Sequence, residues 1–276
     1  MPDAKSISDH WGEGDVYGRI VAALEKTGKR LDALTIEDLA PGDHFHARGF
    51  AATVELADKL PIKSGDHVLD IGCGLGGPAR YLAKRFDCRV SGIDITPPFV
   101  EAANKLTSLV KMDASVKIEL GDGQRLPYPD ASFDGAITQH VTMNIADRAQ
   151  FFGEAFRVLK PGAFLALTEH GLGPKGEPGH PVPWSMDGSG EYLLTPAQTR
   201  HALEKAGFRD IVIEDTGAKY LAGYRATMEK AAQGMLPPLG THLLMGETAA
   251  EKTRNSARNI EEGRTHPFQL ICRKPR

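Results

Sequence analysis

The chain has 276 residues, of which 41% are hydrophobic and 25% charged, an ordinary globular composition with room for one large α/β domain. Its formal net charge is −3, and its basic clusters are short and do not combine into a continuous basic surface. Because neutralisation of phosphates dominates nucleic-acid binding, this charge pattern argues against a nucleic-acid partner. No apolar run approaches the roughly 20 residues of a membrane span, and residues 1–14 are too polar and acidic for a signal peptide.

Residues 1–60 are predicted to form a helical extension. Apolar residues recur at helical spacing over residues 20–39, and Gly28 is predicted to divide this stretch into two helices. Residues 50–60 predict a further amphipathic helix, which Pro61 ends.

From residue 61 to 276 short apolar strands alternate with helices. Strands are expected at 67–71, 89–93, 116–120, 133–138, 164–168, 211–213 and 268–273, and helices at 78–85, 100–110, 149–159 and 196–206. This alternation predicts a parallel sheet with both faces covered. Two cap insertions interrupt it, at 171–194, which is rich in Gly and Pro, and at 219–263, which is expected to be mostly helical. We expect both to lie over the ligand-binding edge of the sheet.

A glycine-rich loop, Asp70-Ile-Gly-Cys-Gly-Leu-Gly-Gly77, follows the first strand and precedes a helix. In this context the glycines let backbone N–H groups approach a ligand, and the helix N-terminus favours a carboxylate or phosphate. Asp94 ends the second strand, roughly 20 residues downstream, where an acid that binds ribose hydroxyls is expected. Together these features predict an adenosine-containing cofactor.

The loop satisfies two known patterns. Gly72, Gly74 and Gly77 fit the dinucleotide pattern G-x-G-x-x-G. Asp70 and Gly76, with the first two of those glycines, fit the S-adenosylmethionine (SAM) pattern, acidic-x-G-x-G-x-G. A carboxylate at Asp70 would be repelled by a pyrophosphate and attracted by the ammonium group of methionine, which favours SAM.

With these motifs the chain resembles the class I SAM-dependent methyltransferases. Gly121-Asp-Gly123 is similar to the family's third cofactor contact, in which the acid binds the adenine amino group. Leu159-Lys-Pro-Gly162 and Leu194-Thr-Pro196 match the turns before the fifth strand and the late helix. The chain is also similar to the small-molecule branch, which includes phosphoethanolamine-type and ubiquinone-pathway enzymes. Two segments match the sarcosine/dimethylglycine type, Asp43-His-Phe-His-Ala-Arg-Gly49 and Asn259-Ile-Glu-Glu-Gly-Arg264.

The resemblance implies a Rossmann-like α/β fold with a seven-stranded, mostly parallel sheet whose last strand is antiparallel. It implies methyl transfer from SAM to a small organic acceptor, with S-adenosylhomocysteine (SAH) as the product. The residues expected to hold the cofactor are Asp70, Gly72, Gly74, Gly76, Asp94, Ile95, Asp122, Gly123, Gln139 and His46.

The chemistry indicates which side chains to seek. Methyl transfer from a sulfonium is an in-line displacement with a good leaving group, so the enzyme mainly aligns the reactants and excludes water. An amine acceptor, which we favour, must be neutral when it attacks, so a base would help. The catalytic candidates lie at or just past strand ends: His140, Glu169 and His170. His140 could instead order a loop or pack on the cofactor, Glu169 could bind a backbone amide or an arginine, and His170 could lie at the surface.

Four further residues are candidates for the acceptor site. Phe45 precedes the predicted domain and could line the pocket. Arg48, with His46, could cover the cofactor or grip an acceptor carboxylate, unless this segment is only a helix N-terminus capped by Asp43. Trp184 and Tyr192 could box a cationic acceptor by cation–π attraction, or could pack the cap onto the core.

No metal is expected, because the strand-end acids are assigned to the cofactor and Cys73, Cys88 and Cys272 are too widely separated for a metal or disulfide pattern. A reducing cytoplasm fits this cysteine usage. We expect a small-molecule acceptor, with neither a nucleic-acid nor a membrane partner, and a homo-oligomer is compatible with the sequence. Two alternatives stay open: a nicotinamide-dependent dehydrogenase, which would share the loop and Asp94, and a catalytically silent SAM-binding module.

Overall fold

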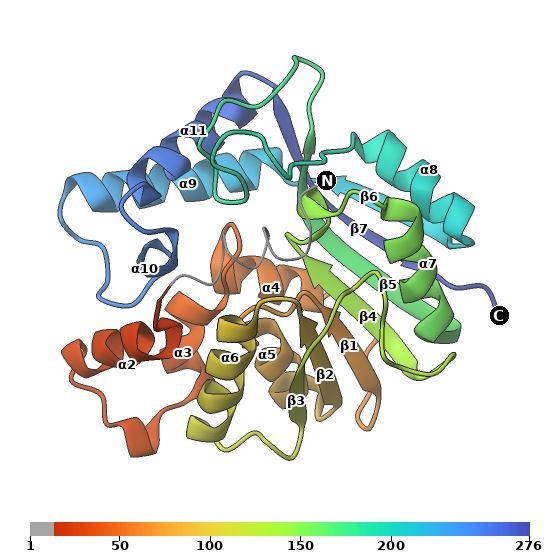
Figure 1. The fold of residues 1–276 in the computed structure, drawn as a ribbon, viewed down its shortest axis with the longest axis horizontal. Helices are drawn as coiled ribbons and strands as arrows, with labels where there is room; N and C mark the ends of the chain where they lie inside the picture. Colours follow the sequence, from red (N-terminus) through yellow and green to blue (C-terminus); the bar gives the residue numbers. More distant parts are fainter. Residues whose placement is uncertain (1–13) are drawn as a thin grey trace.

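The computed structural model describes residues 14–276 and shows one mixed sheet flanked by helices (Figure 1). The seven strands lie in the order β3-β2-β1-β4-β5-β7-β6. Their bounds are β1 His67–Ile71, β2 Arg89–Asp94, β3 Val116–Leu120, β4 Phe133–Gln139, β5 Leu159–Leu172, β6 Arg209–Asp215 and β7 Thr265–Arg273. The predicted seven-stranded α/β fold is confirmed.

The strand order reverses beside β1, which pairs in parallel with both β2 and β4. In open α/β sheets such a switch point opens a crevice at the carboxyl ends of the strands. The predicted antiparallel last strand is also confirmed, because β7 pairs antiparallel with β5 and with β6. The strand β5 is longer than predicted and runs on to Leu172, so it carries the chain from the core to the edge where ligands bind.

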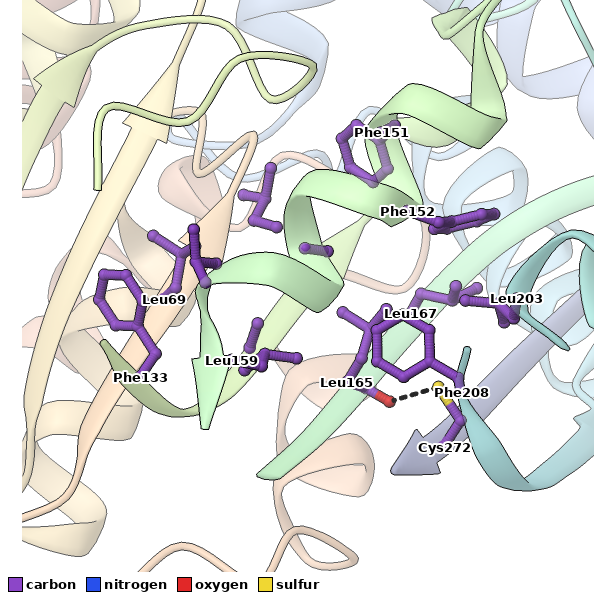
Figure 2. Close-up of a cluster of buried hydrophobic side chains, with 14 of the residues drawn as sticks. Leu69, Phe133, Phe151, Phe152, Leu159, Leu165, Leu167, Leu203, Phe208 and Cys272 are labelled. Atoms are coloured by element: carbon purple, nitrogen blue, oxygen red, sulfur yellow. Dashed lines mark hydrogen bonds between the residues drawn. The ribbon is translucent and has the colours of Figure 1, made fainter. Parts of the chain in front are cut away.

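Helices cover both faces of the sheet. On one face α7 (Arg148–Val158) and α8 (Pro196–Ala206) pack against the strands, and Phe151 and Phe152 of α7 enter a fully buried cluster (Figure 2). On the other face lie α5 (Gly77–Phe86) and α6 (Pro97–Leu109). The helix α8 ends at Gly207, whose φ of 106° is left-handed, as expected for a glycine that stops a helix.

The N-terminal extension is helical, as predicted. Its elements are α2 (Val16–Lys26), the short 3₁₀ helix η1 (Leu31–Ala33), α3 (Ile36–Asp43) and α4 (Gly49–Ala57). Gly28, with a φ of 74°, separates α2 from the next turn, so the predicted division there is confirmed. Ile20 and Leu24 of α2 pack with Leu106 of α6, which attaches the extension to the core.

The segment that follows β6 forms α9 (Gly217–Ala232), α10 (His242–Met245) and α11 (Ala249–Glu261). Figure 1 shows these helices and the loop after β5 together on one side of the sheet. Asn259 of α11 donates to the carbonyl of Gly179 and accepts from its N–H, which joins the two segments. We call residues 173–194 and 217–263 the cap. Within residues 14–276, the structure contains no helix long and apolar enough to cross a membrane.

Candidate active site

A cavity of about 1080 Å³ opens at the carboxyl ends of the strands. The glycine loop and the ends of β2 and β4 form its floor, and the segment before α4 and the cap form its walls. The cavity therefore lies at the switch point beside β1, where the strand order predicts a ligand.

The glycine loop leaves its backbone open to this cavity. Gly72 and Gly74 have left-handed φ values of 73° and 53°. A Cβ at Gly72 would lie 2.3 Å from the side chain of Val141, so only glycine fits there. A Cβ at Gly74 would meet none of the described atoms within 4 Å and would project into open space. A ligand can therefore approach the main chain at Gly74.

Two carboxylates lie behind the loop. Asp94 accepts from the backbone N–H groups of Gly74 at 2.8 Å and Thr96 at 2.9 Å, which fixes its orientation. Asp70 is 2% exposed, and its Oδ2 has no hydrogen-bond partner among the described residues. Burial, together with the charge of Asp94, raises the pKa of Asp70 to about 8. A cationic group beside Asp70 would compensate this buried carboxyl.

The other predicted cofactor residues surround the same end of the cavity. Asp122 accepts from the backbone N–H of Gln124 at 2.8 Å, and Gln139 accepts from Thr53 at 3.3 Å while its Nε2 has no described partner. All the predicted cofactor residues line the cavity except Gly76. That glycine instead begins α5 with a φ of 76° and lies against Arg80.

Two histidines at strand ends are held by two tyrosines of α9. The Nε2 of His140 lies 2.9 Å from the hydroxyl of Tyr220, and the Nε2 of His170 lies 2.9 Å from that of Tyr224. Burial lowers the pKa of His140 well below its usual value, and it lowers the pKa of His170 to about 3. Both imidazoles are therefore neutral at physiological pH. His140 also has a left-handed φ of 58°, and such backbone conformations cluster at functional sites.

His46 lies beside this pair. Its ring stacks on that of His140, with 5.7 Å between centroids and 3° between planes, and its Nε2 lies 3.0 Å from the hydroxyl of Thr53. Burial, first, and the neighbouring His44 lower the pKa of His46 to about 3. The three neutral rings form one wall between the cofactor motifs and the cap.

The structure places all four predicted acceptor-site residues in the cavity lining. Trp184 stacks on His170 with 4.7 Å between ring centroids, and Tyr192 donates its backbone N–H to Met143. Arg48 is ion-paired with Glu55, and its guanidinium carbon lies 5.9 Å from the ring centroid of Tyr220. Phe45 packs edge-on against Phe99.

Glu169 lies outside the cavity lining. It is 1% exposed, forms an ion pair with Arg148 at 3.3 Å and accepts from Thr142 and Thr199. Burial raises the pKa of Glu169, and the charge of Arg148 opposes the rise. This placement fits the alternative in which Glu169 binds an arginine, and Arg148 also donates to the carbonyl of Tyr192.

Sequence reasoning missed Tyr220 and Tyr224. Their spacing of four residues in a predicted helix indicated a shared face, but nothing local showed which strand ends that face meets. Among the described residues, no group of three or more His, Cys, Asp or Glu is placed to hold a metal ion.

Comparisons with known proteins agree with this geometry. Residues 69–167 match the family model described as a methyltransferase domain. The chain is 30% identical over 182 residues to phosphoethanolamine N-methyltransferase 1 of Arabidopsis thaliana, covering 66% of this chain and 36% of that protein. It is 41% identical over 150 residues to 27-O-demethylrifamycin SV methyltransferase of Amycolatopsis mediterranei, covering 52% and 55% respectively. The chain therefore spans only about a third to about half of these relatives.

Among solved structures, a phosphoethanolamine N-methyltransferase 2 of Haemonchus contortus, in complex with phosphomonomethylethanolamine and SAH, has the same fold. The TM-score is 0.75 at 22% identity, covering 92% of this chain and 59% of that one. The domain match shows that residues 69–167 belong to a methyltransferase domain, and the solved structure shows that the chain shares the fold of that enzyme.

Proposed function

We propose that the protein is a methyltransferase that transfers a methyl group from SAM to a small organic acceptor. One observation carries the proposal: a single cavity contains the cofactor motifs at one end and the histidines His140 and His170 beneath a cap at the other. Donor and acceptor can therefore meet in one place that aligns them for methyl transfer.

The residues of the cofactor end fit SAM. Asp94 would bind the ribose hydroxyls, Asp122 the adenine amino group and Asp70 the ammonium group of the methionine part. The open space at Gly74 and the unpartnered Oδ2 of Asp70 support this fit. When bound, SAM supplies a methyl group activated by attachment to a positively charged sulfur. The same observations weigh against a dinucleotide, because a pyrophosphate brings no cation to compensate the buried carboxyl of Asp70.

The residues of the opposite end would orient the acceptor and receive its proton. His140, which is half-buried, and His170, which is buried, are neutral and held by hydrogen bonds, so either imidazole could take the acceptor's proton as negative charge develops on the acceptor. These side chains favour an enzyme over a catalytically silent SAM-binding module. The names of the relatives include both an N-methyltransferase and an enzyme for a 27-O-demethyl compound, so they leave the acceptor atom open.

Calorimetric titration with SAH tests the proposal, with NADH as the competing ligand. We expect SAH to bind and NADH not to bind. Asp94→Ala should weaken SAH binding by about 1.5–3 kcal/mol for each lost hydrogen bond to a charged acceptor, which is at least about tenfold. Asp113→Ala, which removes an exposed acid after α6, is the matched control and should leave affinity unchanged. No binding at millimolar SAH would overturn the proposal.

A further inference from the structure

We infer that the methyl acceptor is the hydroxyl oxygen of a largely apolar molecule that enters without a positive charge, and not an ammonium-forming amine. The inference rests on the proposed function and names its substrate class. It also revises the expectation of an amine held between Trp184 and Tyr192.

The acceptor end of the cavity is lined by side chains that carry no negative charge. We call this end the acceptor chamber and define it as His140, Met143, His170, Trp184, Tyr192 and Tyr224. The acids that line the cavity within residues 14–276 come from α3, from the glycine loop, from the turns after β2 and β3, and from the start of α7: Glu37, Asp43, Asp70, Asp94, Asp122 and Asp147. The cap and the end of β5 contribute none of them.

Three acids that contact or adjoin residues of the cavity lining are already paired. Glu169 faces Arg148 and two threonine hydroxyls. Glu191 accepts from the indole Nε1 of Trp184 and lies 3.5 Å from His180. Glu55 pairs with both Arg48 and Lys219. An ammonium group in the chamber would therefore lose its hydration without gaining a carboxylate partner.

The aromatic rings do not form a free cage for a cation either. Trp184 stacks on His170, with 4.7 Å between ring centroids and 26° between ring planes. The indole N–H of Trp184 donates a hydrogen bond to Glu191. Tyr220 lies outside the cavity lining, and between it and the cavity lie the ring of His140, at 5.6 Å, and the guanidinium of Arg48, at 5.9 Å; both of these residues line the cavity. A second cation there would meet the charge of Arg48, and it would also lie beside the positive sulfur of the donor.

A hydroxyl acceptor meets the opposite conditions. Its apolar body can pack on Met143, Tyr192 and Trp184, and its O–H group can bond to an imidazole. The Nδ1 of His170 has no hydrogen-bond partner among the described residues, although the ring is 1% exposed. A polar ligand atom at this position would satisfy it. The positive sulfur then attracts the developing oxyanion.

The step is balanced without a further reactant. The acceptor oxygen forms a bond to the methyl carbon while the bond from that carbon to sulfur breaks. The electron pair of the broken bond stays on sulfur, and the hydroxyl proton moves to an imidazole nitrogen of His140 or His170. Because both rings are held at Nε2 by tyrosine hydroxyls, Nδ1 is the remaining nitrogen of each ring that would receive the proton.

The test uses pairs of compounds that share one ring system and differ in the acceptor group. Two such pairs are 2-naphthol with 2-naphthylmethylamine and phenol with benzylamine, since both amines are cations at neutral pH. Binding to the SAH complex is measured by calorimetry, and methylation in the presence of SAM is measured by mass spectrometry of the product. We expect the hydroxyl member to bind at least about tenfold more tightly and to be the member that gains a methyl group.

Tighter binding or methylation of the amine member would overturn the inference and leave the methyltransferase proposal standing. Failure of every hydroxyl compound to bind a protein that still binds SAH would also overturn it. Failure of SAH itself to bind would instead count against the proposed function.

One variant tests whether His170 is responsible for the preference for the hydroxyl member of each pair. His170→Phe keeps a ring against Trp184 but removes both nitrogens, so the advantage of the hydroxyl member should shrink at least about fivefold while SAH affinity stays the same. His201→Ala, on the outer surface of α8, is the control and should keep the preference. An unchanged preference in His170→Phe would contradict the part assigned to His170.

Discussion

Arg80 donates from Nη2 to the Oδ2 of Asp43 across 2.9 Å, and both side chains are almost completely buried. The same guanidinium donates to the carbonyl of Leu75 in the glycine loop and to Thr107 in α6. One side chain therefore fastens the loop to the N-terminal extension and to the core. Burial raises the pKa of Asp43, and Arg80 opposes the rise.

Arg80→Met should destabilise the protein strongly, because it leaves Asp43 buried without its cation. Removing one partner of a buried ion pair typically costs about 3–5 kcal/mol of unfolding free energy. Urea denaturation measures the change. Arg85→Met, in the same helix but paired with Asp58 at the surface, is the control and should cost less than about 1 kcal/mol. An equal loss of unfolding free energy in the two variants would show that the buried ion pair contributes no more to stability than the surface ion pair.

Binding of SAH near pH 7 should release protons from Asp70. The carboxyl of the free protein has a pKa of about 8 and is mostly protonated at this pH. An ammonium group beside it favours the ionised form, so its proton is lost on binding. Calorimetry in buffers of different ionisation enthalpy measures the released protons. Asp70→Asn should abolish this release, and an identical release in wild type and variant would exclude Asp70 as its source.

The same carboxyl should make the free protein less stable as pH rises from about 4 to about 8. In this range the unfolded chain, with the ordinary pKa of 3.8, has lost the proton that the folded chain retains. Since the folded state binds more protons, the unfolding free energy falls with pH. Asp70→Asn should flatten the slope in urea denaturation at several pH values. An equal slope of unfolding free energy against pH in the variant would show that other titratable groups cause the slope.

Replacing His140 should reduce turnover without loss of the cofactor. A general base typically contributes about 10²–10⁴ in rate, so His140→Gln should lower kcat within that range while SAH affinity stays the same. Tyr220→Phe removes the hydrogen bond that holds the ring and should lower kcat less, with a shift in the pH profile of kcat. Full activity of His140→Gln would indicate that His170, and not His140, acts as the base.

Trp184 should act on the acceptor and not on the cofactor. Trp184→Phe keeps an aromatic side chain against His170 but loses the bond from the indole to Glu191. We expect kcat/KM for the acceptor to fall at least about fivefold with unchanged SAH affinity. Met186→Ala, at a side chain 46% exposed on the same loop, should change neither. A fall in SAH affinity in Trp184→Phe would show that the cap holds the cofactor instead.

The amino-acid sequence by itself predicted the strands, the helices of the core and, with the exception of Gly76, residues that line the proposed cofactor end of the cavity. Strand and helix signals are local, because periodicity, prolines and glycines act on neighbouring residues, as at Gly28 and Gly207. The positions of Asp70, Gly74 and Asp94 followed equally well, since parallel strands bring their carboxyl ends to one edge and the loop between them is short.

Only the tertiary structure decided the other end of the cavity. His140 and Tyr220 are 80 positions apart, and His170 and Tyr224 are 54 apart, so their hydrogen bonds depend on how α9 packs over β4 and β5. Glu169 precedes His170 by one position, yet alternation along β5 directs it to Arg148 and away from the cavity. Which side of a strand faces a ligand, and which face of a helix closes over it, is set by packing between distant segments and not by local residue order.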